Sequence, residues 1–400
     1  MKILQVNKFY YPKRGADKYF FFITKLLRAR GHEVRTFAMV DPKNLPSDDE
    51  AYFSQNIDLH TRSLAGKLKA AGAILYNFEA KQKFARLLKD FQPDIIHCHN
   101  IYHQLSPSIL DAAREAKIPV VMHLHDYKLI CPNYKLYVRG EACTRCKPNH
   151  YSRCLRYRCV DNSWTKSALA ALEMTLHHRY LHIYERGVKL FIAPSRFMKE
   201  ICTDFGWPAQ RFRVLENISP VEKITKGILG DYYLYFGALE EEKGVDILIR
   251  AAAKSGKKVK IAGTGQDEKK LKQLNTNFGS PAEFVGQLQG KDLEQIIAQA
   301  LAVVIPSRWP ENMPLAAIEA MGMGKFVIGA DIGGLSELLI PGKTGALFPV
   351  NDWQALSQLL DDTDQVSATA IGQRAAASRE GKDQDWHYQA LLKIYQEAIK

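Results

Sequence analysis

The sequence predicts an α/β protein of two domains, each built on a doubly wound parallel sheet. Its 400 residues are more than one hydrophobic core usually supports. Short apolar runs alternate with amphipathic stretches in both halves of the chain, which is the pattern of a parallel sheet with crossover helices. Several apolar runs end in polar residues, and the carboxyl ends of parallel strands are where such folds bind ligands.

Composition narrows the class of protein. The chain is 46% apolar and 24% charged, which is ordinary for a soluble globular protein. No apolar run approaches the roughly 18 residues that a membrane span needs. The first residues, MKILQV, are typical of a strand rather than of a signal peptide. We therefore expect a cytoplasmic protein.

The net charge of +12 lies entirely in the first half of the chain. Residues 1–205 hold 33 Lys and Arg against 19 Asp and Glu, and the remainder holds 22 against 24. A basic half beside a near-neutral half indicates an anionic partner for the first domain, such as a phosphorylated substrate or a membrane surface. Nucleic acid ranks lowest because no nucleic-acid-binding module is recognisable, and we expect none as a partner.

The first elements form a βαβ unit. Residues 2–6 predict a strand, an amphipathic helix follows from Gly15 to about Arg30, and Gly31 ends that helix before a second strand. Gly15 lies in the loop at the start of the helix. A lone glycine loop of this kind points only weakly to phosphate binding.

Residues 63–90 predict a helical segment with a basic surface. Leu64, Leu68, Leu75 and Phe78 recur at helical spacing, and six Lys and Arg residues are interspersed along the segment. Two interpretations are open. The segment is either a core helix with a solvated basic face or a helix that lies on anionic lipid.

Two further buried strands, within 93–99 and 118–127, end in polar residues. His125 and Asp126, at the end of the second, are the best acid–base candidates of the first half. The alternative for a single histidine is a satisfied position in the core.

A cysteine-rich insert at 129–163 interrupts the alternation. It holds five of the seven cysteines, together with several Arg and Lys residues. In a cytoplasmic protein such clustering argues against disulfides and for a metal. The pairs Cys143–Cys146 and Cys154–Cys159 suit a tetrahedral thiolate site, a candidate for structural zinc. Unligated, redox-labile thiols are the alternative, because nearby cations depress thiol pKa values.

The remaining elements follow the same alternation. In the first domain they are a long helix from about Trp164 to Arg186, a strand at 188–195, a helix from Arg196 and a strand near 211–215. Residues 216–230 are turn-rich and read as a linker. The second half repeats strand and helix, with Gly263–Gly265 and Gly333–Gly334 as tight turns and a hairpin-like segment at 341–350. A final amphipathic helix at 383–400 needs an apolar partner, for which the first domain is the natural candidate.

A strand–turn–helix stretch at 303–320 holds the main candidate site. An apolar strand is stopped by Pro306 and Pro310, and Pro314 suits the first turn of the next helix. The backbone N–H groups near the positive end of that helix favour an anionic ligand. They belong to Asn312, Met313 and Leu315.

Two glutamates flank this helix start. Glu311 precedes the helix and Glu319 lies inside it, so their carboxylates are available to sugar or ribose hydroxyls beside a docked phosphate. Lys243, four residues past the end of another strand, is placed to reach a diphosphate. The alternative is an ordinary strand–helix junction with two solvated glutamates.

These landmarks together resemble the retaining glycosyltransferases of family 4, which have the GT-B fold. The resemblance rests on Glu311-x7-Glu319, FGALEEEKG at 236–244, GGLSELL, GKTGALF, HDYKLICP and the N-terminal NKFYYPKRGADKYFFFITKLLRARGHEV. It covers nearly the whole chain, and the cysteine insert after the HD motif is similar to a subset of that family.

The resemblance implies two Rossmann-like domains that face each other across a cleft. The N-terminal acceptor domain would span 1–215, the nucleotide-sugar domain 216–382, and the 383–400 helix would return to the first domain. By that analogy Glu319 holds the ribose, Glu311 a hydroxyl of the donor sugar, and Lys243 the diphosphate. His125 lines the reacting centre. Further donor contacts are implied for the backbone at Asn312, Met313, Pro314 and Leu315 and for Gly15 in the opposing loop.

The chain departs from the family's usual sequence at two positions that would contact the diphosphate. The family usually has Arg five residues before the lysine, and this chain has Ala238. Arg14 stands where the family's loop often has a second glycine, and we expect it to compensate from the opposite domain. The resemblance implies catalysis without a metal cofactor, because Lys and N–H dipoles neutralise the leaving diphosphate.

The implied activity is retaining transfer of a hexose-type sugar from a UDP- or GDP-sugar. The acceptor would be a glycan or a lipid-linked oligosaccharide in bacterial surface polysaccharide synthesis. The basic first domain would then meet the anionic inner face of the cytoplasmic membrane. A nucleotide-sugar epimerase and a catalytically idle nucleotide-sugar-binding protein are the alternatives.

Overall fold

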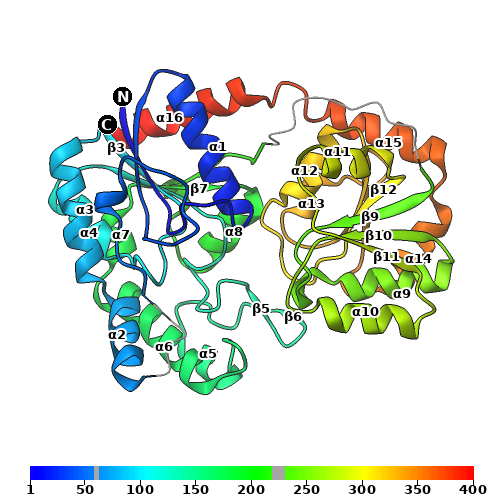
Figure 1. Cartoon of the computed structure of the whole chain (residues 1–400), viewed down its shortest axis with the longest axis horizontal. Coiled ribbons are helices and arrows are strands. Elements are labelled where there is room, and N and C mark those ends of the chain that lie inside the picture. The colour runs from blue at the N-terminus through cyan, green and yellow to red at the C-terminus, as the bar shows by residue number, and fades with distance from the viewer. Residues whose placement is uncertain (58–62, 219–229) are drawn as a thin grey trace.

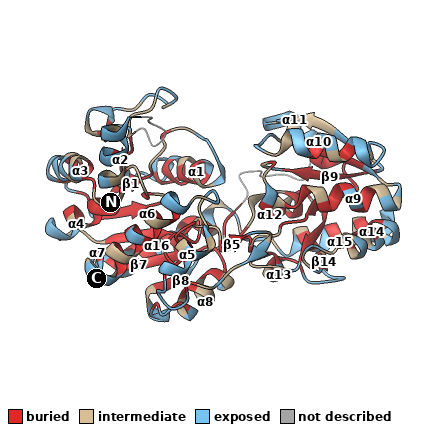
Figure 2. Cartoon of the chain, turned by 90° about the horizontal axis from the view of Figure 1, so that it is seen from below, coloured by how far each residue is buried: buried red, intermediate tan, exposed pale blue. Residues whose placement is uncertain are grey.

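The computed structural model describes residues 1–57, 63–218 and 230–400, which form two lobes side by side (Figure 1). Each lobe has a six-stranded sheet in which all strand pairs are parallel. In both lobes the buried residues concentrate in the strands, while the outer faces of the helices are exposed (Figure 2). The predicted α/β class is confirmed.

The first lobe has the sheet order β2-β1-β3-β4-β7-β8. Its strands are β1 (Lys2–Val6), β2 (Glu33–Phe37), β3 (Ile95–Cys98), β4 (Val120–His123), β7 (Leu190–Ala193) and β8 (Phe212–Val214). Its helices are α1 (Gly15–Ala29), α2 (Leu64–Leu75), α3 (Phe78–Phe91), α4 (Ser108–Glu115), α6 (Trp164–Thr175), α7 (Ile183–Gly187) and α8 (Arg196–Asp204). The insert adds a two-stranded ribbon, β5 (Tyr137–Val138) with β6 (Glu141–Ala142), and α5 (Ser152–Tyr157).

The second lobe has the sheet order β11-β10-β9-β12-β13-β14. Its strands are β9 (Tyr232–Phe236), β10 (Lys258–Ala262), β11 (Ala282–Gly286), β12 (Ala302–Ile305), β13 (Phe326–Ala330) and β14 (Ala346–Phe348). Its helices are α9 (Val245–Ser255), α10 (Glu268–Asn277), α11 (Gly290–Gln299), α12 (Leu315–Gly322), α13 (Leu335–Leu338), α14 (Trp353–Asp362) and α15 (Gln365–Ala377). The order reverses between β9 and β12, so the loops after these strands flank a topological switch point, where such folds bind ligands.

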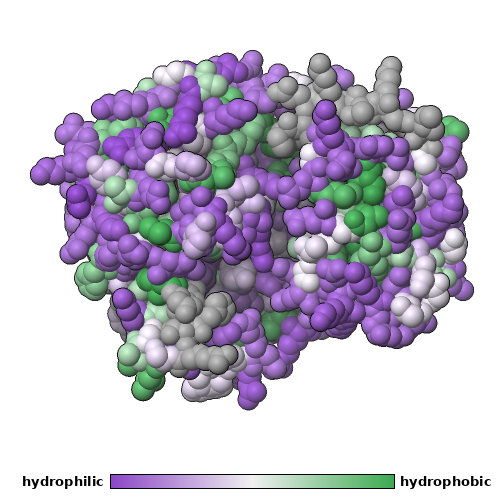
Figure 3. All heavy atoms as spheres, in the orientation of Figure 1, coloured by the Kyte–Doolittle hydropathy of each residue, from purple (hydrophilic) through white to green (hydrophobic). Residues whose placement is uncertain are grey.

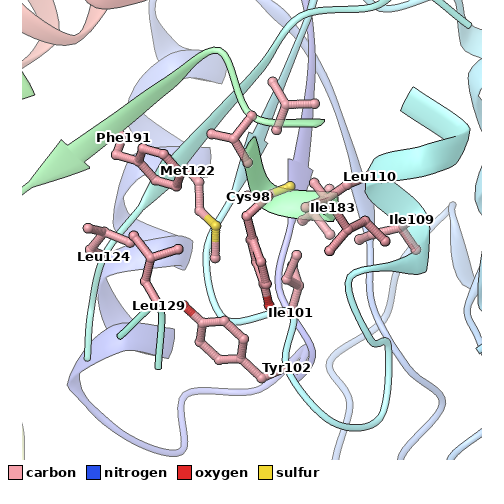
Figure 4. Packing of buried hydrophobic residues seen from close by; sticks show 14 of the residues in the cluster. Cys98, Ile101, Tyr102, Ile109, Leu110, Met122, Leu124, Leu129, Ile183 and Phe191 are labelled. Carbon is pink, nitrogen blue, oxygen red and sulfur yellow. The ribbon is translucent and has the colours of Figure 1, made fainter. Parts of the chain in front are cut away.

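Apolar packing between strands and helices holds each sheet in place. In the first lobe Met122 of β4 lies between Phe191 of β7 and Cys98 of β3, and Leu110 of α4 and Ile183 of α7 belong to the same buried cluster (Figure 4). The three strand side chains are almost completely buried, which is the environment expected of central strands covered on both faces.

The last helix, α16 (Gln384–Ile399), returns to the first lobe (Figure 1). Leu391, Ile394 and Tyr395 are buried in one cluster with Ile3 of β1 and Tyr19 of α1. The apolar face of this helix therefore packs on the first lobe, as predicted.

Three segments differ from the sequence-based expectation. The 63–90 segment is two helices, because Asn77 caps α3 by accepting a hydrogen bond from the Ala80 backbone N–H. The helix predicted from Trp164 to Arg186 is divided into α6, a π-helical turn and α7, with His182 in the left-handed region. Residues 341–350 are no hairpin, since β14 pairs in parallel with β13. Most of the predicted linker lies outside the described residues.

For the 63–90 segment, the core-helix interpretation is confirmed for α3, whose apolar face is buried around Phe84. Leu64, Leu68 and Phe78 are 75%, 67% and 70% exposed, so a core position is wrong for these three side chains. Among the described helices, none is long and apolar enough to cross a bilayer.

Candidate functional site

The loop after β12 carries a buried carboxylate. Glu311 is only 5% exposed and accepts hydrogen bonds at Oε1 from Ser307 Oγ, at 2.6 Å, and from Lys243 Nζ, at 2.8 Å. Lys243 reaches it from the loop after β9 and also lies over the ring of Trp309. The predicted cation and carboxylate are therefore neighbours in the second lobe, on either side of the switch point.

The start of helix α12 faces the first lobe. Pro314 is its N-cap residue, and Leu315 is its first helical residue. The Asn312 amide donates to the backbone oxygen of Leu124, at 2.8 Å, and accepts from Ser195 Oγ, at 3.0 Å. Asn312 thus links the helix start to the residue that precedes His125.

Two glycines hold the Glu311–Asn312 backbone in position. Gly333 has φ +63°, and a Cβ there would stand 2.3 Å from the Glu311 carbonyl oxygen. A Cβ at Gly334 would stand 1.8 Å from the Asn312 carbonyl oxygen, and the Gly334 N–H donates to the Glu311 carbonyl. Gly333 has the predicted positive φ, whereas Gly334 does not, with φ −70°; both glycines permit a close backbone approach.

Glu319 lies one turn into α12 and is partly buried. Burial raises the pKa of its carboxyl to about 7, against an opposing effect of Lys18. A carboxyl whose pKa is raised by burial is a candidate functional residue.

The loop before α1 reaches across to the second lobe. A methyl group at Gly15 would stand 3.4 Å from Leu315 Cδ1. The Arg14 guanidinium pairs with Glu240 at 2.9 Å, two residues beyond Ala238. These contacts bring the predicted loop residues to the helix start and to the β9 loop.

His125 belongs to a buried group of imidazoles that the sequence did not reveal as a group. It stacks on His123 and His99, with ring centroids 4.5 and 5.2 Å apart, and its Nε2 lies 2.9 Å from His99 Nδ1. Burial lowers the pKa of His125 to about 3, so its ring is neutral at pH 7.

Further contacts between the lobes come from residues that sequence reasoning missed. Tyr127 Oη donates to the Pro310 carbonyl, at 2.6 Å, and Ser195 contacts Asn312. Asn217, in the segment that joins the lobes after β8, donates to the Met313 carbonyl. A signal existed for Tyr127, which follows His125 and Asp126 directly, but none for Ser195, whose role depends on how the lobes meet. Figure 3 shows the surface recessed where the lobes meet.

The cysteines of the insert gather as predicted, but not as a metal site. Five sulfur-bearing side chains line one small cavity, Cys131, Cys143, Cys146, Cys154 and Cys159. Among the described residues, no three His, Cys, Asp or Glu side chains are arranged to hold a metal ion, so the zinc tetrahedron predicted at the last four is not found. One physical obstacle to zinc binding is burial, because a thiol must lose its proton to become a zinc ligand and burial favours the neutral form. Burial raises the pKa of Cys131 to about 12 and also raises that of Cys146.

Two parallel α/β lobes with a recess where they meet are the GT-B fold, a class that the solved structure of Anabaena Alr3699/HepE also has. The chain matches the family description "Glycosyltransferase Family 4" over residues 13–222 and "Glycosyl transferases group 1" over residues 227–375. The chain belongs to glycosyltransferase family 4. It is a retaining hexosyltransferase, and its catalysis needs no metal ion.

Individual relatives are distant but span most of the chain. An uncharacterized 42.6 kDa protein in the cps region of Klebsiella pneumoniae is 24% identical, over 84% of this chain and 87% of that protein. A GDP-mannose-dependent alpha-mannosyltransferase of Mycolicibacterium smegmatis is 25% identical, over 82% of this chain and 79% of that protein. The crystal structure of Anabaena Alr3699/HepE in complex with UDP and glucose superposes with a TM-score of 0.68, at 20% sequence identity. The superposition covers 99% of this chain and 100% of that chain.

Proposed function

We propose that this enzyme transfers a hexose-type sugar from a UDP- or GDP-sugar to a glycan or lipid-linked oligosaccharide in bacterial surface polysaccharide synthesis. The observation that carries the proposal is the pairing of Lys243 with buried Glu311 beside the start of α12. An ammonium group, a helix N-terminus and a carboxylate suit a sugar-bearing diphosphate. The relative from a cps region and the mannosyltransferase agree with this class of reaction.

Each group has a role in the proposed donor complex. Lys243 and the backbone from Asn312 to Leu315 neutralise the diphosphate, and Glu319 accepts hydrogen bonds from the ribose hydroxyls. Glu311 holds a hydroxyl of the donor sugar. Gly15 lets the opposing loop approach the diphosphate, and Arg14 supplies the guanidinium that Ala238 lacks. His125 lines the face where the sugar reacts.

The proposed reaction is a front-face displacement. The acceptor hydroxyl enters on the side from which the nucleoside diphosphate leaves, and the departing β-phosphate takes its proton. Positioning and stabilisation of the leaving charge then provide most of the catalysis. Glu311 and His125 steady the oxocarbenium-like sugar.

The domain assignment follows from these roles. Residues 1–215 form the acceptor domain, 216–382 the nucleotide-sugar domain, and 383–400 the helix that packs on the first. The return of α16 to β3 and β4 supports the last boundary.

The first experiment is a thermal-shift screen with UDP-, GDP- and ADP-sugars, because a specific ligand raises the melting temperature by mass action. Transfer is then assayed with the donor that binds. Isomerisation of the free donor without any acceptor would identify an epimerase. Binding without either reaction would identify an idle binding protein, and the absence of any shift would contradict the proposed donor site.

We also propose that the acceptor domain contacts anionic membrane through helices α2 and α6, which touch each other. Leu64 and Leu68 of α2 and Trp164 and Leu172 of α6 are more than half exposed. Lys67 and Lys69 are exposed on the same helix as the two leucines. Apolar side chains flanked by lysines suit the boundary between acyl chains and anionic headgroups.

Flotation with vesicles of anionic and of neutral lipid tests this surface. The double variant Leu64→Glu, Leu68→Glu should lose binding to the anionic vesicles. Val366→Glu is the matched control, because Val366 is 80% exposed on α15 of the other lobe. Failure of the wild-type protein to float, or equal effects of both changes, would remove the membrane contact and leave a soluble acceptor.

A further inference from the structure

A hydrogen-bonded chain connects His125 to the C-terminal helix through the interior of the first lobe. His125 Nε2 lies 2.9 Å from His99 Nδ1, and His99 Nε2 lies 2.8 Å from Gln5 Oε1. On its other side the Gln5 amide nitrogen lies 3.3 Å from Tyr395 Oη, on α16. His99, Gln5 and Tyr395 are completely buried, so water cannot substitute for any of these partners.

The far end of this chain fixes the orientation of the Gln5 amide. Tyr395 Oη lies within hydrogen-bond distance of His97 Nδ1, at 2.7 Å. The same hydroxyl oxygen accepts from the Gln5 NH2 group, which also lies 3.3 Å from His97 Nδ1. With its donors committed to this side, Gln5 presents only its carbonyl oxygen to His99.

That carbonyl oxygen determines the protonated nitrogen of both imidazoles. An amide oxygen accepts and cannot donate, so His99 carries its proton on Nε2. Burial lowers the pKa of His99 well below its usual value and that of His125 to about 3, so both rings are neutral. Neutral His99 must accept at Nδ1, and His125 must therefore carry its proton on Nε2.

We propose that Gln5, His99 and Tyr395 are positioning residues, which hold His125 as the Nε2–H tautomer so that Nδ1 is a hydrogen-bond acceptor for a donor-sugar hydroxyl. The inference rests on the proposed function of His125. It also gives the C-terminal helix a role beyond covering apolar surface, because Tyr395 completes the chain from α16. A partner that fixes the tautomer of an active-site histidine contributes strongly to turnover without touching substrate.

The tautomer is measurable without any substrate. Long-range 1H–15N spectra of protein containing 15N-labelled histidine distinguish protonation at Nε2 from protonation at Nδ1, and the signals that vanish in His125→Gln identify His125. At pH 7 the wild-type ring should be neutral with its proton on Nε2. A charged ring, or a proton on Nδ1, would overturn the proposal and leave the proposed glycosyl transfer intact.

Kinetics of two nearly isosteric variants test the consequence. His99→Asn retains an oxygen close to the position of the imidazole Nδ1, whereas His99→Leu offers no acceptor. We expect kcat of His99→Leu to fall roughly 10–100-fold, with the KM for the donor changed less than about threefold, as when an outer hydrogen-bond partner of an essential side chain is lost. His99→Asn should recover most of that loss.

The control lies in a neighbouring strand of the same sheet. Thr36→Val in β2 removes a buried hydrogen bond to Asp49 that is not part of this chain and should leave kcat unchanged. Equal losses in His99→Asn and His99→Leu, with unchanged tautomer signals, would reduce His99 to a structural role and overturn the inference. Absence of transfer by the wild-type enzyme with every donor would instead contradict the proposed function.

Discussion

Lys243 Nζ lies 2.8 Å from Glu311 Oε1, so the cation and the carboxylate proposed for two parts of one donor are bonded to each other. Glu311 also accepts from Ser307, and its side chain is buried. A carboxylate in such surroundings is costly without a partner, and Lys243 supplies one. An entering donor must therefore exchange this pair for two new ones, diphosphate with Lys243 and sugar hydroxyl with Glu311.

The exchange predicts different losses for the two partners. Lys243→Met should weaken binding of UDP or GDP roughly 10–100-fold, the value of one charge-assisted hydrogen bond. Glu311→Gln frees the lysine, so it should bind the nucleoside diphosphate at least as well as the wild type while transferring sugar at least about 100-fold more slowly. Calorimetry and single-turnover assays measure the two effects. A parallel loss of diphosphate affinity in both variants would contradict the exchange.

The raised pKa of Glu319 predicts that the free energy of unfolding depends on pH. Burial raises the pKa of its carboxyl to about 7 from 4.5. Between these values the folded protein keeps a proton that the unfolded chain has released, so the contribution of this group to stability falls as pH rises through the window. Glu319→Gln, neutral throughout, should stabilise the fold by about 3 kcal/mol at pH 8 and by under about 1 kcal/mol at pH 5. Thermal melts at both pH values measure the difference, and an equal gain at both would refute the raised pKa.

The same group predicts proton release on donor binding. Ribose hydroxyls that donate to Glu319 favour its ionised form, so binding at pH 7 should release up to about half a proton. Calorimetry in buffers of different ionisation enthalpy counts the released protons. Glu319→Gln should release none, and an identical count in that variant would exclude Glu319 as the source.

Arg14 predicts an effect on turnover that is separate from stability. Its pair with Glu240 is exposed on the arginine side, and such pairs contribute about 0–1 kcal/mol to folding. Arg14→Ala should therefore leave the melting temperature nearly unchanged but lower turnover roughly 100-fold, if the guanidinium stabilises the leaving diphosphate. Lys147→Ala, which breaks another exposed pair of the first lobe, is the control. An unchanged rate in Arg14→Ala would end the proposal for this residue.

Gly334 predicts a steric effect on the site. A Cβ there would collide with the Asn312 carbonyl, so Gly334→Ala should displace the start of α12 and lower nucleoside diphosphate affinity at least about 10-fold. Gly322→Ala, at the other end of that helix, meets no atom within 4 Å and should gain up to about 1 kcal/mol of stability. Equal affinities in the two variants would mean that the loop tolerates the shift.

Much of the fold follows from local pattern. The β1–α1 unit and the final helix agree with the sequence because apolar periodicity, Gly31 and the Asp383 cap act within a few residues. The Glu311–Glu319 stretch was recognisable for the same reason, since a proline-stopped strand and a helix start are local signals. Strand pairing in the second lobe depends on contacts that are distant in sequence. The sequence pattern therefore did not predict that β14 pairs in parallel with β13.

The sequence by itself determined two α/β lobes, the family motifs and the candidates Lys243, Glu311 and Glu319. Only the tertiary structure decided that Lys243 pairs with Glu311, that Arg14 reaches Glu240, and that His125 is joined through His99 and Gln5 to Tyr395. It also decided that Leu64 and Leu68 face solvent. These facts depend on strand order and on the approach of the lobes, which bring together residues up to 390 positions apart, whereas sequence pattern reports only what a residue's near neighbours require.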